Sequence, residues 1–212
     1  FIFGLAVGSF LNVISLRYDP DKFIFNRSII GGRSHCPKCR NKLEWFELVP
    51  LLRFLFLRGR CRTCRQKIGF QYPLVELTSG LIFVLIPSYL YNLPAFKLTG
   101  FSSLNYTLVA IGYTLVFLTL LLITLIDFRL KLIPDEANIF LVILGIAISI
   151  LAIRDPAGNL HSFLGSYSIL FGLSASIWLN RLAAILFGII FYGLLILITQ
   201  GRGMGMGDLK LT

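Results

Sequence analysis

The sequence contains little charge. Only 14% of its 212 residues are Asp, Glu, Lys or Arg, whereas a soluble domain usually carries about 25%. Hydrophobic residues make up 56% of the chain and the mean hydropathy is +0.81. Several uninterrupted apolar runs approach the roughly 20 residues that a helix needs to cross a bilayer. This composition excludes an ordinary soluble protein and predicts an all-α polytopic membrane protein, built as a transmembrane helix bundle.

Acidic residues are scarcer still, with ten against 20 Lys and Arg. Residues 17–71 hold 13 of these cations and four of the acids, so they account for +9 of the net charge of +10. A basic insert between apolar segments is typical of a cytoplasmic loop. Anionic lipid headgroups are the expected partner of an insert at the membrane surface. We do not expect it to bind nucleic acid.

Five apolar stretches are expected to cross the membrane: 1–16, 74–93, 104–126, 138–153 and 182–199. The segment 157–180, with many Ser and Gly, could also cross or could lie at the interface. Lys and Arg gather in the predicted inner turns if it does not cross, which favours an interfacial position.

Three regions follow from this pattern. Residues 1–16 are a first span that begins inside an apolar run, 17–72 are the basic insert, and 73–212 are a membrane bundle. Because the sequence starts at Phe1 and stops just after a motif, we expect both ends to continue in a longer protein, with further C-terminal spans.

All four cysteines lie in the basic insert, as the pairs Cys36-x2-Cys39 and Cys61-x2-Cys64 with 21 residues between them. Disulfides are disfavoured in the cytoplasm, so metal ligation is the better interpretation. Four thiolates around Zn²⁺ form a tetrahedral structural site, which predicts a small zinc-ribbon-like module. The alternative is four unconnected reduced thiols. His35 is interpreted as a bystander, because four cysteines already complete the site.

Two acids stand near the ends of apolar runs. Asp127 follows the third run, and Asp208 ends the glycine-rich stretch "TQGRGMGMGD". If 157–180 does not cross, both acids reach the same membrane face, where two close carboxylates would share a proton as in aspartic proteases. Glycines without Cβ atoms would let the backbone before Asp208 approach a substrate closely.

Each acid also has a simpler interpretation. Asp127 could be an acid at a membrane boundary, and Asp208 could cap the helix that follows it. Asp135, directly after Pro134, is expected to lie in the first turn of a helix, where acids are favoured.

Taken in order, the motifs resemble those of the prepilin peptidases, the type IV leader peptidase family of GxGD membrane aspartyl proteases. They are "GSFLNV" at 8–13, "CPKC" and "GRCRTC" in the insert, "YPLVE" at 72–76, "DFRLKLIPD" at 127–135 and "GMGDLKL" at 205–211.

The resemblance implies that Asp127 and Asp208 form the catalytic pair, in a multi-pass protein of the bacterial inner membrane with its active site and zinc insert on the cytoplasmic side. It implies cleavage, after a glycine, of the basic leader of prepilins or pseudopilins. Many members then methylate the new N-terminus with S-adenosylmethionine, and the four-cysteine insert is associated with these bifunctional forms.

The chain departs from the family pattern in three places. The spacing from Asp127 to Asp208 is longer, with 157–180 as the added piece, Arg53 stands where a small polar residue is usual, and the C-terminal spans are missing. Glu44, Glu47 and Glu76 are the acids available to meet a basic leader or a cofactor amine.

Three hypotheses remain open at this point. The protein is a bifunctional peptidase and methyltransferase, a peptidase with a purely structural zinc module, or a non-enzymatic membrane scaffold or transporter with a zinc ribbon. The last one predicts that Asp127 and Asp208 are unrelated.

Overall fold

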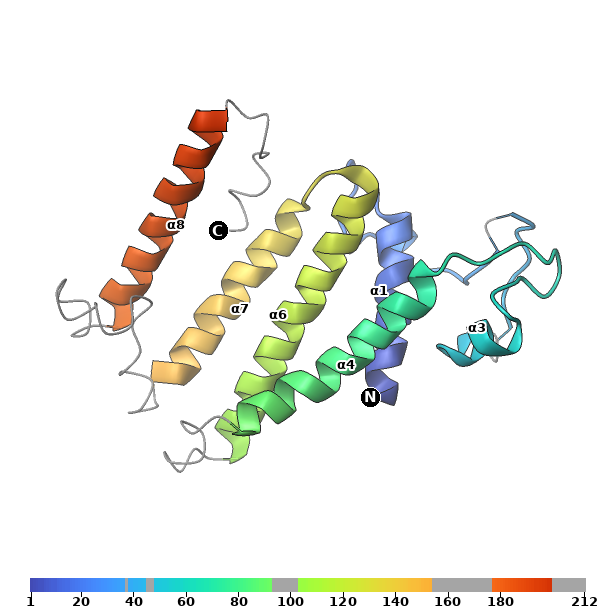
Figure 1. Ribbon diagram of the computed structural model, residues 1–212, viewed down its shortest axis with the longest axis horizontal. Helices are drawn as coiled ribbons and strands as arrows, with labels where there is room; N and C mark the ends of the chain where they lie inside the picture. The colour runs from blue at the N-terminus through green and yellow to red at the C-terminus, as the bar shows by residue number, and fades with distance from the viewer. Residues whose placement is uncertain (37, 45–47, 93–102, 154–176, 200–212) are drawn as a thin grey trace. The chain divides into compact units, whose positions relative to one another are not determined.

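The computed structural model describes residues 1–36, 38–44, 48–92, 103–153 and 177–199 (Figure 1). Within these residues the secondary structure is helical and contains no strand. The helices are α1 (Ile2–Arg17), α2 (Arg27–Ile30), α3 (Leu52–Phe56), α4 (Gln71–Asn92), α6 (Ser103–Leu130), α7 (Asp135–Ile153) and α8 (Ile177–Thr199).

The chain divides into two compact units. The first comprises Phe1–Leu90 and Tyr113–Ala137, and the second comprises Tyr91–Gly112 and Asn138–Thr212. Helix α6 therefore contributes to both.

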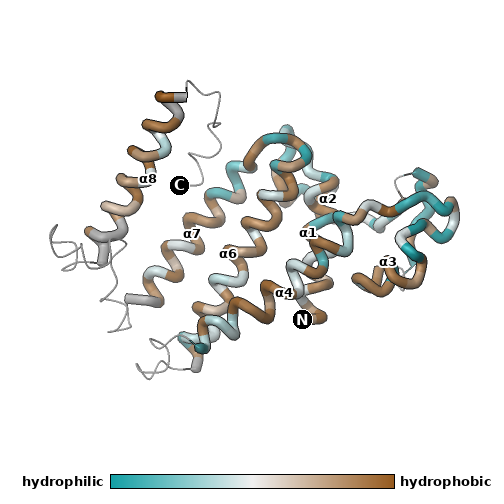
Figure 2. The backbone as a smooth tube through the Cα atoms, in the orientation of Figure 1, coloured by the Kyte–Doolittle hydropathy of each residue, from teal (hydrophilic) through white to brown (hydrophobic). Residues whose placement is uncertain are grey.

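Two described helices are long and apolar enough to cross a membrane. They are α4, with a mean hydropathy of 1.6 in its most apolar window, and Leu104–Leu130 of α6, with 2.5. Helix α1 and Leu182–Leu195 of α8 are shorter apolar helices. Figure 2 shows that apolar residues follow the long helices, whereas hydrophilic residues gather in the insert between α1 and α4.

One predicted boundary was wrong. The third apolar stretch was expected to end at residue 126, but α6 continues to Leu130. A helix ends where its backbone hydrogen bonds end, and charged residues do not interrupt them. The helix stops where Lys131 adopts a left-handed backbone with φ 58°, and Pro134 lies three residues further on, where it cannot donate to a helical ladder. The expected helix start at Asp135 is confirmed, with Asp135 and Glu136 in its first turn.

Helices α1 and α4 approach each other through small residues. A Cβ atom added to Gly8 would lie 2.7 Å from the Cβ of Ser79 and 2.8 Å from the carbonyl oxygen of Val75. One added to Gly4 would lie 2.8 Å from the Cα of Gly80. Small residues at a membrane helix interface allow such close backbone contact. This contact closes the base of the insert that joins the two helices.

We predict that Gly8→Ala lowers the free energy of unfolding by about 1–3 kcal/mol, because the new methyl group has no room against α4. Gly145→Ala is the matched control, since Gly145 in α7 has nothing within 4 Å of an added Cβ. It should leave stability unchanged or raise it by up to about 1 kcal/mol, as Ala is the better helix former. Thermal unfolding of both purified variants tests this, and equal stabilities would contradict the close packing of α1 on α4.

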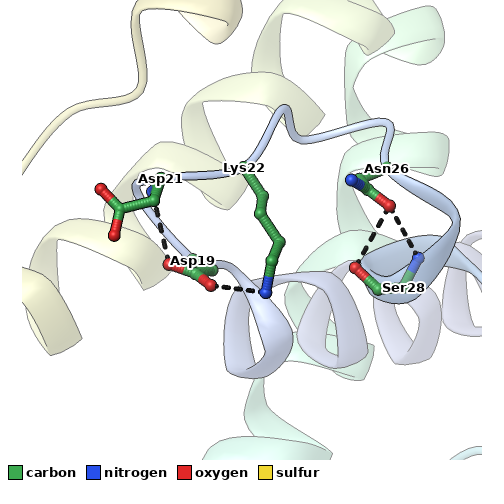
Figure 3. A network of polar contacts seen from close by, with 5 residues as sticks. All are labelled: Asp19, Asp21, Lys22, Asn26 and Ser28. Atoms are coloured by element: carbon green, nitrogen blue, oxygen red, sulfur yellow. Dashed lines mark hydrogen bonds and ion pairs between the residues drawn. The ribbon is translucent and has the colours of Figure 1, made fainter.

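The segment after α1 folds back to build a core at this end of the first unit. Its buried residues come from α1, the loop, α2 and α6: Ile14, Tyr18, Ile24, Ile29, Leu122 and Ile126. Figure 3 shows the polar contacts that shape the loop. Asp19 accepts hydrogen bonds from Lys22 Nζ at 2.8 Å and from the Asp21 backbone at 3.3 Å. Asn26 caps α2 by accepting from the Ser28 backbone at 3.1 Å.

In the second unit, helix contacts again involve a glycine and aromatic rings. An added Cβ on Gly112 of α6 would lie 2.8 Å from Ile148 of α7. The rings of Tyr91 and Tyr106 meet edge to face with centroids 6.0 Å apart. Along α8, Phe187 and Phe191 stack at 6.1 Å.

Candidate functional site

The four cysteines of the insert come together. Their sulfur atoms all lie within 4.8 Å of one another, and Cys36 Sγ and Cys64 Sγ are 3.8 Å apart. A zinc ion bound at about 2.3 Å from each of four sulfurs requires them to be about 3.8 Å apart. Cys36 and Cys61 are buried, whereas Cys39 and Cys64 are more open to solvent. The donor set and its spacing therefore fit a tetrahedral metal ion.

Two matching turns present these cysteines. Residues 36–42 read CPKCRNK and residues 61–67 read CRTCRQK, which is the same pattern twice. In each turn the first cysteine donates its backbone N–H five residues ahead, to Asn41 at 3.0 Å or to Gln66 at 2.8 Å. The residue after the second cysteine is left-handed in both, with φ 54° at Arg40 and 53° at Arg65. These two turns, which we call the cysteine knuckles, therefore share one backbone geometry.

Side chains link the knuckles to each other in a reciprocal way. Lys38 Nζ donates to Gln66 Oε1 at 2.9 Å, and Asn41 Nδ2 donates to Thr63 Oγ1 at 2.9 Å. Lys38 and Thr63 occupy the same position in the two repeats, as do Asn41 and Gln66. The contacts are therefore related by an approximate twofold axis. The sequence shows this repeat, although the spacing of the cysteines alone does not reveal it.

The local backbone also favours the thiolate form of Cys36. Hydrogen bonds from the backbone N–H groups of Cys39 and Lys38 lower the pKa of Cys36 to about 6, against the effect of burial. Metal binding requires deprotonated thiols, so the fold favours the ligating form of this cysteine before any metal arrives.

Asp127 lies in the last turn of α6, where it is partly buried beside the fully buried Ile126. Its carbonyl accepts the backbone N–H of Lys131 at 2.8 Å. A carboxylate is disfavoured near a helix C-terminus, because the helix dipole places negative charge there. The charge of Asp127 therefore does not stabilise the end of its helix. Asp208 lies outside the described residues.

A neighbouring cation fixes the end of α6. The guanidinium of Arg129 donates to the carbonyl of Ser15 at 2.7 Å and also to that of Leu16. These carbonyls belong to the last turn of α1, whose backbone acceptors have no partner within the helix. This contact holds the last turn of α6, which carries Asp127, against the last turn of α1.

A cavity of about 330 Å³ lies between the insert, the C-terminal half of α1 and the first turns of α4. Both buried cysteines, Cys36 and Cys61, line it. Glu76, only 7% exposed, contributes its carboxylate to the wall. Of the three acids singled out in the sequence, Glu44 is exposed and Glu47 lies outside the described residues. Only Glu76 is placed in this cavity.

Comparison with known proteins agrees with these motifs. Residues 2–90 match the model of the Bacterial Peptidase A24 N-terminal domain. Over its full length the chain is 32% identical to a prepilin leader peptidase/N-methyltransferase of Klebsiella pneumoniae and covers 79% of that protein. It is also 32% identical, again over its full length, to the Bacillus subtilis protein of the same name, of which it covers 68%.

The chain belongs to the prepilin leader peptidase/N-methyltransferase family. The resemblance inferred from its motifs is thereby confirmed. A Myxococcus xanthus member is 51% identical over 83 residues, which are 39% of this chain and 23% of that relative. No solved structure matches the chain significantly.

The residues that match the A24 N-terminal domain form one continuous part of the fold of this peptidase/methyltransferase family member. Residues 2–90 contain α1, the insert and all but the end of α4. The cysteine cluster and the cavity of Glu76 therefore both lie inside the matched domain, whereas Asp127 lies beyond it.

Proposed function

We propose that this protein is a membrane aspartyl endopeptidase that cleaves the basic leader of prepilins or pseudopilins after a glycine, on the cytoplasmic side of the bacterial inner membrane. We propose further that it methylates the new N-terminus with S-adenosylmethionine. The observation that carries the proposal is the end-to-end match to relatives named for both activities. The cysteine cluster within the matched domain supports it.

For the cleavage step, Asp127 and Asp208 are proposed to share one proton. The ionised carboxylate takes a proton from water as the water oxygen attacks the scissile carbonyl. The protonated carboxyl gives its proton to the leaving amide nitrogen, so the pair exchanges roles in each turnover.

The four thiolates are proposed to hold one structural Zn²⁺. A closed shell of four protein ligands leaves no position for a substrate, so the metal orders the insert and takes no part in the chemistry. S-adenosylmethionine supplies the methyl group when bound. Anionic lipid headgroups are the proposed partner of the basic insert.

The experiment that tests this function combines two readouts on one purified protein in lipid nanodiscs. A prepilin with its leader is added with S-adenosylmethionine carrying a labelled methyl group. Cleavage together with label on the new N-terminus supports the bifunctional enzyme. Cleavage without label leaves a peptidase with a structural zinc module. The absence of both cleavage and label would favour the non-enzymatic scaffold.

The multi-pass topology is part of the proposal, with the five predicted stretches crossing and Asp127 and Asp208 on one face. Most of the segment predicted to lie at the outer interface, 157–180, is outside the described residues. Its last residues belong to α8, which begins at Ile177, earlier than the predicted span at 182.

We predict that Gly158→Cys and Asn180→Cys are both labelled by a membrane-impermeant thiol reagent on intact cells. If the segment crossed, about 30 Å of hydrocarbon would separate Asp208 from Asp127 and no shared proton would be possible. The native cysteines lie in the cytoplasmic insert of this topology, so the unsubstituted protein is the control. Protection of position 180 until the cells are opened would rule out the shared face.

A further inference from the structure

The cavity beside the zinc module is lined by two side chains of opposite charge, the buried Glu76 and the partly buried Arg53. Glu76 accepts the backbone N–H of Leu51 at 2.8 Å and a hydrogen bond from the Ser9 side chain. Arg53 also lines the cavity, and its Nε atom is buried without a hydrogen-bond partner in the described part of the chain. Arg53 is close enough to act electrostatically on Glu76. Among the described residues, however, no ion pair joins the two side chains.

The other basic side chains that line the cavity either donate hydrogen bonds to backbone carbonyls or are exposed to solvent. Arg17 donates its guanidinium to the carbonyls of Gly31 and Arg33, and Lys67 is exposed to solvent. What remains inside is one positive and one negative group with unused hydrogen-bonding capacity. Buried groups of this kind are costly unless something pairs with them. A ligand that satisfies both carries an ammonium and a carboxylate close together, as the end of an α-amino acid does.

The rest of the lining suits an aromatic and apolar ligand body. Phe54 and Tyr72 contribute rings, and Leu43, Val49 and Ile68 contribute aliphatic surface. The Phe54 ring is braced by an edge-to-face contact with Phe70, at a centroid distance of 5.8 Å. Flat aromatic bases stack on such rings. The volume falls within the range of small-molecule sites, which are mainly apolar with a few placed polar groups.

We propose that this cavity binds the methyl donor, with Glu76 accepting hydrogen bonds from the donor's ammonium, Arg53 binding its carboxylate, and the aromatic residues contacting its adenine. The inference rests on the proposed function and names the site at which its cofactor would bind. It also gives the zinc module a role in donor binding, because Cys36 and Cys61 form part of the cavity wall. Loss of the metal would remove that wall and with it the donor site.

The test measures equilibrium binding of S-adenosylmethionine and of adenosine to the purified protein in nanodiscs without anionic lipid. Glu76→Gln keeps the size and the acceptor for Leu51 but removes the negative charge, and Arg53→Gln removes the positive charge together with the guanidinium. Each should weaken S-adenosylmethionine binding by about ten- to a hundredfold, the usual effect of losing a charge-assisted hydrogen bond. Adenosine, which lacks the amino-acid end, should bind all the proteins equally.

Arg58→Gln is the matched control, an exposed arginine of the same insert outside the cavity, and it should bind the donor normally. Zinc content should be unchanged in all three variants, and leader cleavage should be unchanged in Arg58→Gln. Equal donor affinity in wild type and variants overturns the cavity as donor site and leaves the proposed function standing. A parallel loss of adenosine binding overturns the assignment of the two charges. A wild-type protein that cleaves but binds no donor overturns both the donor site and the methyl-transfer half of the proposed function.

Discussion

Asp127→Asn and Asp208→Asn are each expected to abolish leader cleavage, with a loss of at least about a thousandfold in rate. A carboxamide can neither take a proton from water nor give one to the leaving amine, and proton transfer of this kind typically contributes 10²–10⁴-fold. Loss of either acid should therefore remove the shared-proton mechanism entirely. The measurement is the rate of prepilin cleavage by purified protein, with zinc content and melting temperature confirming that each variant is folded.

Asp135→Asn is the matched control, because it makes the same chemical change eight residues further along. Asp135 lies in the first turn of α7, where its charge interacts favourably with the helix dipole by about 0.3–1 kcal/mol. Its replacement should cost a little stability and most of the activity should remain. Substantial cleavage by Asp127→Asn or Asp208→Asn would remove that residue from the mechanism.

The second large effect concerns the cysteine cluster. The purified protein should contain one zinc ion per chain, and Ser in place of Cys36, Cys39, Cys61 or Cys64 should release it and unfold the insert. Metal binding supplies about 10–16 kcal/mol in isolated zinc modules, so an incomplete shell removes much of the folding energy of a polar insert. Elemental analysis measures the zinc, and proteolysis of the insert reports its order.

His35→Ala should retain its zinc, since four sulfurs already complete the shell. His35 is exposed, and its Nδ1 lies 3.4 Å from the Arg33 carbonyl. Because protons compete with the metal for thiolates, zinc should also be released as the pH is lowered. Wild-type protein without zinc, or cysteines that are fully alkylated in the native state, would contradict the metal site.

The cysteine cluster could be predicted from sequence because its information is local. Each Cys-x2-Cys turn specifies its own geometry, and only the meeting of the two turns requires the fold. The start of α7 could also be predicted from the sequence, since Pro134 and the acids after it mark a first turn. The end of α6 was not, because hydropathy shows where an apolar surface ends, whereas backbone hydrogen bonding continues through Asp127 to Leu130.

The donor cavity could not be predicted from the sequence pattern. In the sequence, Glu76 is a lone acid near the start of an apolar stretch, and Arg53 is one of many cations in the basic insert. Their relation depends on the insert folding back over the first turns of α4, which brings the backbone of Leu51 to Glu76. No periodicity or spacing encodes a contact between a loop and a helix that lie so far apart along the chain.

The glycine contact between α1 and α4 has an entropic consequence for the insert. A free chain loses conformational freedom when its ends are brought together, and this loss grows with the logarithm of its length. Here the packing of Gly8 against Ser79 already holds the two ends of the insert near each other. Zinc therefore has to order only the interior of a closed loop. The same sequence cut out as a free peptide would have to close the loop as well, and it would bind zinc more weakly than the insert does between its two helices.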